Sequence, residues 1–92
     1  MKLPFTIIST DTEMIRYTRN LKELVWYQEL IYKDDVFIGE IFTNITGEGY
    51  LLKKAYNIMV DDTQPPIYAT KTVAQFDTVC DAKEFVNQAN GI

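Results

Sequence analysis

The strongest constraint on the fold is a pair of β-rich runs near the middle of the chain. Residues 24–32 and 36–42 are dense in β-branched and aromatic side chains, which favour a pleated, half-buried surface. Lys33, Asp34 and Asp35 separate the two runs, and aspartate tolerates the backbone geometry of a tight turn. The pattern predicts a β-hairpin. Gly39, inside the second run, indicates a bulge or a close approach of two backbones.

The flanking segments extend this hairpin towards a meander. Residues 3–9 and 67–73 are typical of strands, and residues 47–49 (Gly-Glu-Gly) are typical of a turn. Two further segments, 11–22 and 50–60, fit either a helix or a strand by the spacing of their apolar residues. Because both adjoin expected strands and turns, we favour a strand in each.

The end of the chain predicts an amphipathic helix. Thr78 is placed to cap it, Asp81 and Glu84 fall in its early turns, and Gly91 is placed to stop it. Its apolar stripe consists of Val79, Ala82, Phe85, Val86 and Ala89. Such a stripe must be buried, most simply against a sheet.

We therefore expect an α+β fold, a single domain over residues 1–92. It consists of an antiparallel β-sheet, a meander of about four to five strands, with the C-terminal amphipathic helix packed on one face. A chain of 92 residues and 10.7 kDa has no room for a second domain. The stretch 61–66, with two consecutive prolines, is expected to be a loop.

The residue inventory argues against catalysis. The chain has no histidine and one cysteine, Cys80, which excludes His-based acid–base chemistry, His-dependent triads, internal disulfides and Cys-rich zinc sites. The four glycines do not match a phosphate or dinucleotide loop. We expect no enzyme activity, no cofactor and no metal, and we expect Cys80 to be buried on the apolar stripe.

Charge and aromatic side chains favour a binding surface instead. The net charge of −4 argues against nucleic acid and anionic membranes as partners, and it permits an acidic face for a basic protein. Neighbours on a strand point to opposite faces, so one of Trp26 and Tyr27 is expected outside, where it can anchor a partner. The predicted partner-binding residues are Trp26, Tyr27, Glu29, Asp34, Asp35, Glu40, Glu48, Asp61 and Asp62.

The chain shows no targeting pattern. The first nine residues hold one positive charge and a short apolar run that Pro4 and Thr6 interrupt, unlike a signal peptide. No apolar run is long enough to cross a bilayer. We expect a cytoplasmic protein without membrane contact.

Four features of the chain resemble those of small phage-encoded accessory proteins. They are its small size, its Tyr- and Asn-containing strands, its lack of histidine and its segment from Phe76 to Val86 (Phe-Asp-Thr-Val-Cys-Asp-Ala-Lys-Glu-Phe-Val). The resemblance implies a chain that works in the host cytoplasm, where it binds and disables one host protein, including restriction or other defence factors. Some antirestriction proteins of this kind act as acidic DNA mimics.

The function expected from the sequence is a small non-enzymatic protein-binding module, a phage-type inhibitor of a host defence or DNA-binding protein such as a nuclease. It would act by stoichiometric contacts through an acidic, aromatic-bearing surface, with DNA mimicry as one form. One alternative is an assembly subunit that self-associates, for example as a homodimer. Another is a single-stranded nucleic-acid binder that stacks bases on the hairpin aromatics.

Overall fold

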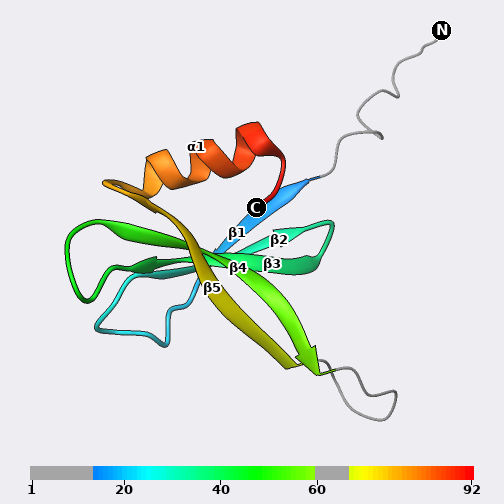
Figure 1. The fold of residues 1–92 in the computed structure, drawn as a ribbon, viewed down its shortest axis with the longest axis horizontal. Coiled ribbons are helices and arrows are strands. Elements are labelled where there is room, and N and C mark those ends of the chain that lie inside the picture. Colours follow the sequence, from blue (N-terminus) through cyan, green and yellow to red (C-terminus); the bar gives the residue numbers. More distant parts are fainter. Residues whose placement is uncertain (1–13, 60–66) are drawn as a thin grey trace, which may run out of the picture.

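The computed structural model describes residues 14–59 and 67–92. They form a five-stranded antiparallel sheet in the order β1-β2-β3-β4-β5, followed by one helix (Figure 1). The elements are β1 (Ile15–Arg19), β2 (Gln28–Lys33), β3 (Val36–Thr43), β4 (Tyr50–Met59), β5 (Ile67–Phe76) and α1 (Val79–Ala89). The expected antiparallel meander and C-terminal helix are confirmed. The strand expected over 3–9 and the loop expected over 61–66 lie outside the described residues.

The turn between β2 and β3 has a backbone geometry that suits a hairpin. Asp34 and Asp35 both have positive φ, 51° and 66°, which is the type I′ geometry that matches the twist of a hairpin. Two segments fitted either a helix or a strand: 50–60 contains strand β4 (Tyr50–Met59), and 11–22 contains the short strand β1 (Ile15–Arg19). The hairpin is therefore confirmed, and the two strand preferences are confirmed over the residues of β1 and β4.

The prediction for residues 24–27 was wrong. The expected strand over 24–32 begins only at Gln28, and residues 20–27 form the connection between β1 and β2. Val25 and Trp26 favour strands intrinsically, but this preference reflects packing on a half-buried sheet. β2 begins only where β1 and β3 lie on either side of it. Residues 24–27 have no sheet surface to pack against, so their strand propensity does not produce a strand.

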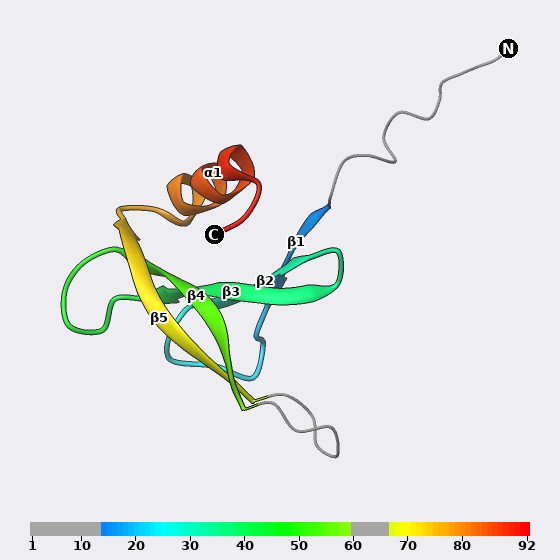
Figure 2. The same ribbon diagram turned by 45° about the vertical axis from the view of Figure 1, so that its right-hand side comes forward.

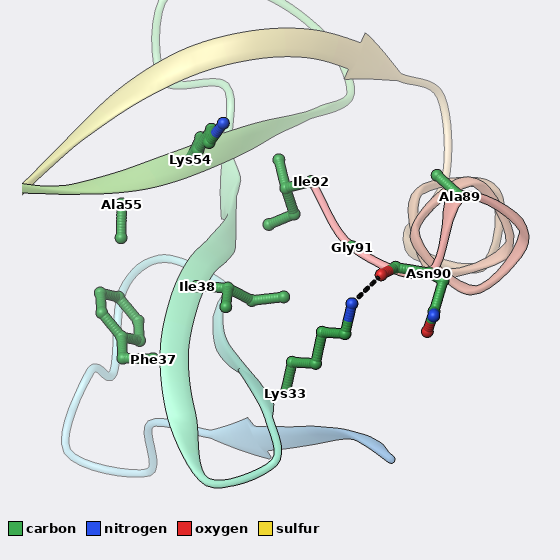
Figure 3. Close-up of a pocket in the computed structure, with 9 residues that line it drawn as sticks. All are labelled: Lys33, Phe37, Ile38, Lys54, Ala55, Ala89, Asn90, Gly91 and Ile92. Carbon is green, nitrogen blue, oxygen red and sulfur yellow. Dashed lines mark hydrogen bonds between the residues drawn. The ribbon is translucent and has the colours of Figure 1, made fainter. Parts of the chain in front are cut away.

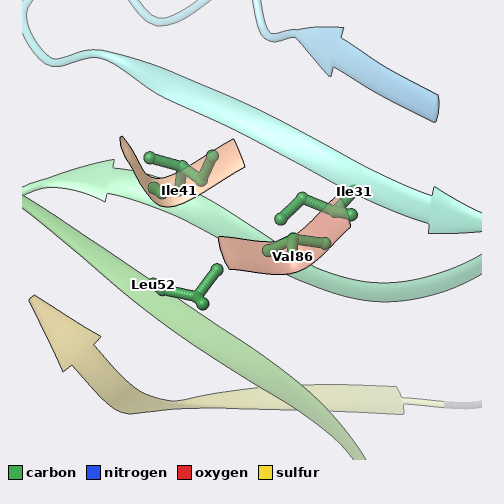
Figure 4. Packing of buried hydrophobic residues seen from close by; sticks show 5 residues of the cluster. Ile31, Ile41, Leu52 and Val86 are labelled. Atoms are coloured by element: carbon green, nitrogen blue, oxygen red, sulfur yellow. The ribbon is translucent and has the colours of Figure 1, made fainter. Parts of the chain in front are cut away.

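The core is one cluster of buried side chains from β2, β3, β4 and α1. Residues directly opposite each other on paired strands share a face, as do residues two apart on one strand. The pairings Ile31–Gly39 and Ile41–Leu52 therefore place Ile31, Ile41 and Leu52 on one face of the sheet. Ile31, Ile41 and Leu52 are fully buried, as are Ala82 and Val86 of α1, and all five belong to one cluster (Figure 4). α1 runs along the same side of the sheet (Figure 2).

The helix has the expected cap. The Thr78 side chain accepts a hydrogen bond from the Asp81 backbone N–H at 3.1 Å, which satisfies an otherwise orphaned donor. Asn90 ends the helix in the left-handed conformation. Of the predicted stripe only Ala82 and Val86 are fully buried, whereas Phe85 is 44% exposed. α1 is neither long nor apolar enough to cross a membrane, the described residues being those searched.

Cys80 is exposed, which corrects the expectation that it is buried. It follows Val79 in the first turn, and the buried positions of α1 are Ala82 and Val86. At about 100° per residue, position 80 falls outside the narrow stripe that these two define. The apolar face of this helix is therefore narrower than the sequence suggested.

The meander gives the sheet two distinct ends. The loop end is formed by residues 20–27, 44–49 and 77–78, the connections that follow β1, β3 and β5. The turn end is formed by the Asp34–Asp35 turn, the end of β4 and the start of β5. The three connections of the loop end lie on the left in Figure 1.

Candidate interaction surface

The β1–β2 connection exposes four large apolar side chains. Leu21 is 79% exposed, Leu24 89%, Val25 74% and Trp26 41%. We call these four residues the apolar loop. Single exposed apolar residues are ordinary on a protein surface. Four within one short connection make it a candidate interaction surface. Of the predicted aromatic pair, Trp26 is therefore the exposed member.

Hydrogen bonds within the connection hold the apolar loop in shape. The Glu23 carboxylate accepts from the backbone N–H groups of Val25 at 3.0 Å and Trp26 at 3.2 Å. The Asn20 side chain accepts from Lys22 N–H at 3.1 Å and donates to the Gln28 side chain at 2.7 Å. The exposed side chains are thus presented on an ordered scaffold, which lowers the entropy lost on binding.

Tyr27 and Glu29 turn inward, towards α1. Glu29 is only 5% exposed, and its carboxylate accepts from the Tyr27 hydroxyl and from Lys83 Nζ at 2.9 Å. The Tyr17 hydroxyl donates to Asn87 Oδ1 at 2.8 Å in the same region. The Glu29 carboxylate is therefore hydrogen-bonded to residues of its own chain. This differs from the sequence analysis, which grouped Glu29 with the surface acids. Its polar neighbours satisfy a charge that would otherwise be costly to bury.

The two tyrosines of this network, Tyr17 and Tyr27, have raised pKa values. Partial burial, together with the hydrogen bond to Glu29 and the charge of that carboxylate, raises the pKa of Tyr27 to about 12. Burial and the charge of Glu29 also raise the pKa of Tyr17. Both hydroxyls therefore stay protonated near neutral pH and act as hydrogen-bond donors.

The other predicted acids do not gather in one place. Asp34 and Asp35 lie at the turn end, where Asp35 pairs with Arg16 at 3.2 Å. Glu40 lies in mid-sheet, opposite Lys53, and accepts from the Gln28 side chain at 2.6 Å. Glu48 lies at the loop end. Asp61 and Asp62 lie outside the described residues.

A hollow of about 440 Å³ opens at the loop end, between the end of β5 and the first turns of α1. We call it the acidic groove; its lining residues are Gln75, Phe76, Asp77, Asp81, Glu84, Phe85 and Gln88. The Gln75 side chain donates to the Glu48 carbonyl at 2.8 Å, so the β3–β4 turn adjoins this groove. Sequence reasoning had assigned Asp81 and Glu84 to the helix dipole and had not singled out Asp77 as a candidate.

A second pocket, of about 390 Å³, lies where the C-terminal residues meet the sheet (Figure 3). Lys33 and Lys54 are among its lining residues. The Lys33 ammonium donates to the Asn90 carbonyl at 2.7 Å. α1 has no basic residue in its last turn, so Lys33 supplies from the sheet the cation that a helix C-terminus favours. This lysine has a structural role in the pocket.

Within the described ranges, no three or more acidic or cysteine side chains are grouped so as to hold a metal ion. Comparisons with known protein families, curated proteins and solved structures found no match to this chain.

Proposed function

We propose that this chain is a small protein-binding module that acts by stoichiometric contact through the loop end of its sheet. The observation that carries the proposal is the apolar loop, four exposed apolar side chains on a hydrogen-bonded connection. Burying each such side chain contributes roughly 1.5–3 kcal/mol. Tryptophan is enriched among the residues that dominate binding energy.

The topology supports the loop end as one surface. Three connections that are distant in sequence lie at this end of the sheet, and loops held by a rigid sheet are common places for binding residues. Ile45, in the β3–β4 turn, is also exposed. The loop end therefore offers apolar contacts on the β1–β2 side and carboxylates on the β5–α1 side.

The proposal includes α1 packed on one face of the sheet as a fixed element. Three features support this packing: Ala82 and Val86 share the buried cluster, Lys83 pairs with Glu29, and Tyr17 bonds Asn87. A fixed helix would hold the acidic groove at a constant position relative to the apolar loop.

The proposed partner is a basic protein, and the class favoured by the sequence resemblance is a host defence or DNA-binding protein met by a phage-encoded inhibitor. Its support is the net charge of −4 and the carboxylates at the loop end. DNA mimicry needs acids spaced like phosphates along one surface. Because Asp34 and Glu48 lie at opposite ends of the sheet, the proposal relies on the loop end alone.

The test is quantitative capture from nuclease-treated bacterial lysate. Leu24→Thr/Val25→Thr removes apolar area from the apolar loop, and Val36→Thr/Ile67→Thr makes matched changes at exposed positions of the turn end. We expect the loop variant to lose the dominant captured protein by about tenfold or more, since hot-spot losses reach about 2 kcal/mol. The turn-end variant is expected to retain it.

Equal capture by both variants would contradict the proposed surface. Recovery of the bait alone, as a defined multimer, would support the assembly-subunit alternative instead.

Single-stranded nucleic-acid binding is a second candidate, favoured by a row of aromatic rings on the other face of the sheet. Arg16 lies 4.7 Å from the Tyr32 ring, Tyr32 contacts Phe37, and Phe37 contacts Tyr68, with ring centroids 5.8 and 5.7 Å apart. Stacking on such rings is tolerant of sequence. Salt-dependent binding of oligonucleotides, weakened by Tyr32→Leu, would support it, whereas binding that salt does not affect would exclude it.

A further inference from the structure

We propose that the acidic groove takes an arginine side chain of the partner, stacked on the exposed ring of Phe85. This inference rests on the proposed function and names the chemistry that one half of the loop end recognises. The residues that line the groove come from the end of β5, from Asp77 and from α1; Figure 1 shows how β5 leads into α1.

The floor of the groove is aromatic. The rings of Phe76 and Phe85 pack with centroids 5.5 Å apart and an interplanar angle of 47°. Phe85 is still 44% exposed, although it lies on the stripe that a helix normally buries. Phe85 also lines the hollow of about 440 Å³, so its exposed ring is available there for a flat group to stack on.

The acidic side chains around the Phe85 ring favour a positively charged ligand. Asp77, Asp81 and Glu84 line the groove, and none of its lining residues is basic. None of the three carboxylates has a hydrogen bond or ion pair with another described residue. The cations of the loop end, Arg19 and Lys22, lie at the β1 edge of the sheet, on the other side from β5. No cation within the groove competes with a ligand.

Guanidinium fits this combination better than ammonium. It is planar, stacks on aromatic faces and carries five N–H donors, so one group can stack on Phe85 and bond more than one carboxylate. Gln75 and Gln88 supply further amide groups at the rim. The groove also adjoins the surface assigned to the partner, because Gln75 bonds the Glu48 turn. An arginine of the bound partner would therefore enter the groove without a separate docking event.

The probe is a blocked tripeptide, Gly-Arg-Gly, compared with the same peptide carrying citrulline, the neutral isostere of arginine. Chemical shifts of the labelled full chain are followed by NMR. We expect the arginine peptide to shift the Phe85 and Gln88 signals, and to bind at least about tenfold more tightly than the citrulline peptide, because both charge and cation–π attraction are lost in the latter. Gly-Lys-Gly is expected to fall between them.

Two variants locate the site. Asp77→Asn/Glu84→Gln should abolish the preference for arginine over citrulline, while Asp34→Asn/Asp35→Asn, an equal charge change at the turn end, should leave it intact. Asparagine tolerates the left-handed backbone of that turn, so the control should fold. Equal binding of both peptides, or an arginine preference that survives Asp77→Asn/Glu84→Gln, would overturn the inference.

The apolar-loop variant separates this inference from the proposed function. Leu24→Thr/Val25→Thr should bind the arginine peptide as the parent chain does, because the groove is at the other edge of the sheet. If that variant loses its protein partner while the groove variant keeps it at full affinity, the proposed function stands and the arginine inference fails.

Discussion

Glu29 shows how much depends on single residues in this small fold. It is the buried charged residue of the described chain, and Lys83 Nζ and the Tyr27 hydroxyl compensate its carboxylate. Its partners come from the helix and from the β1–β2 connection, which ends at Tyr27. Removing one member of such a group leaves the others without compensation, which costs more than removing a surface contact.

Lys83→Met should therefore destabilise the fold by about 2 kcal/mol, below the roughly 3–5 kcal/mol of fully buried pairs because Lys83 is partly exposed. Glu29→Met/Lys83→Met should cost less than Lys83→Met alone, since no uncompensated carboxylate is left. Urea unfolding of the three proteins measures this order. A double variant that is less stable than the single one would contradict the account.

Alkaline pH should unfold the chain partly through Tyr27. Its folded-state pKa of about 12 lies above the ordinary 10.0, so the native state keeps a proton that the unfolded chain loses. The stability from this hydroxyl is full below pH 10 and is lost as pH rises from about 10 to about 12. In that window we expect the free energy of unfolding to fall more steeply in the parent chain than in Tyr27→Phe. Parallel curves would contradict this assignment.

Gly39 occupies a position with no room for a side chain. A Cβ there would overlap the backbone carbonyl of Lys53 and the Ile92 side chain. We expect Gly39→Ala to lower the free energy of unfolding by about 1–3 kcal/mol, the usual cost of overpacking. Gly47→Ala is the matched control, because its Cβ would meet only the movable Asn44 amide at 3.0 Å. Equal losses in both variants would contradict this account, because the lower backbone entropy of an unfolded chain with alanine would by itself stabilise either variant.

Elements whose signals are local were predictable from the sequence. The hairpin follows from two β-rich runs and a turn of two aspartates, and the helix follows from Thr78 and an apolar stripe. The start of β2 was not predictable, because Val25 and Trp26 have strand propensity without a sheet beside them. The narrow buried face of α1, which leaves Cys80 and Phe85 outside, depends on how the helix meets the sheet.

The Glu23 carboxylate contributes to the order of the apolar loop, and this contribution can be measured at the level of the element. Glu23→Ala removes the acceptor for Val25 and Trp26 N–H groups. We expect amide exchange at these two positions to become about tenfold faster, with little change in global stability, because the loop opens locally. Lys22→Ala leaves that acceptor in place and is expected to leave both exchange rates unchanged. Unchanged exchange in Glu23→Ala would show that other contacts order the loop.

Across the whole molecule, the sheet places its apolar loop and its acidic groove at one end. The sequence predicted an acidic, aromatic-bearing binding surface, which stays a prediction; of its residues, Trp26 and Glu48 lie at the loop end. The grouping of Asp77, Asp81 and Glu84 around Phe85 could not be read from the sequence. Which acids share a surface depends on strand register and on the approach of the helix, and a shift of one residue reverses the face of every side chain on a strand.

Trp26 allows the central claim to be tested directly, because it is the chain's single tryptophan and lies on the apolar loop. The chain is labelled with 5-fluorotryptophan, and its ¹⁹F resonance is followed while the captured, unlabelled partner is added. If the loop end is the binding surface, the resonance shifts and broadens in step with complex formation, and its sensitivity to solvent falls. A complex that forms in full by size-exclusion chromatography while the Trp26 resonance stays unchanged would contradict the account.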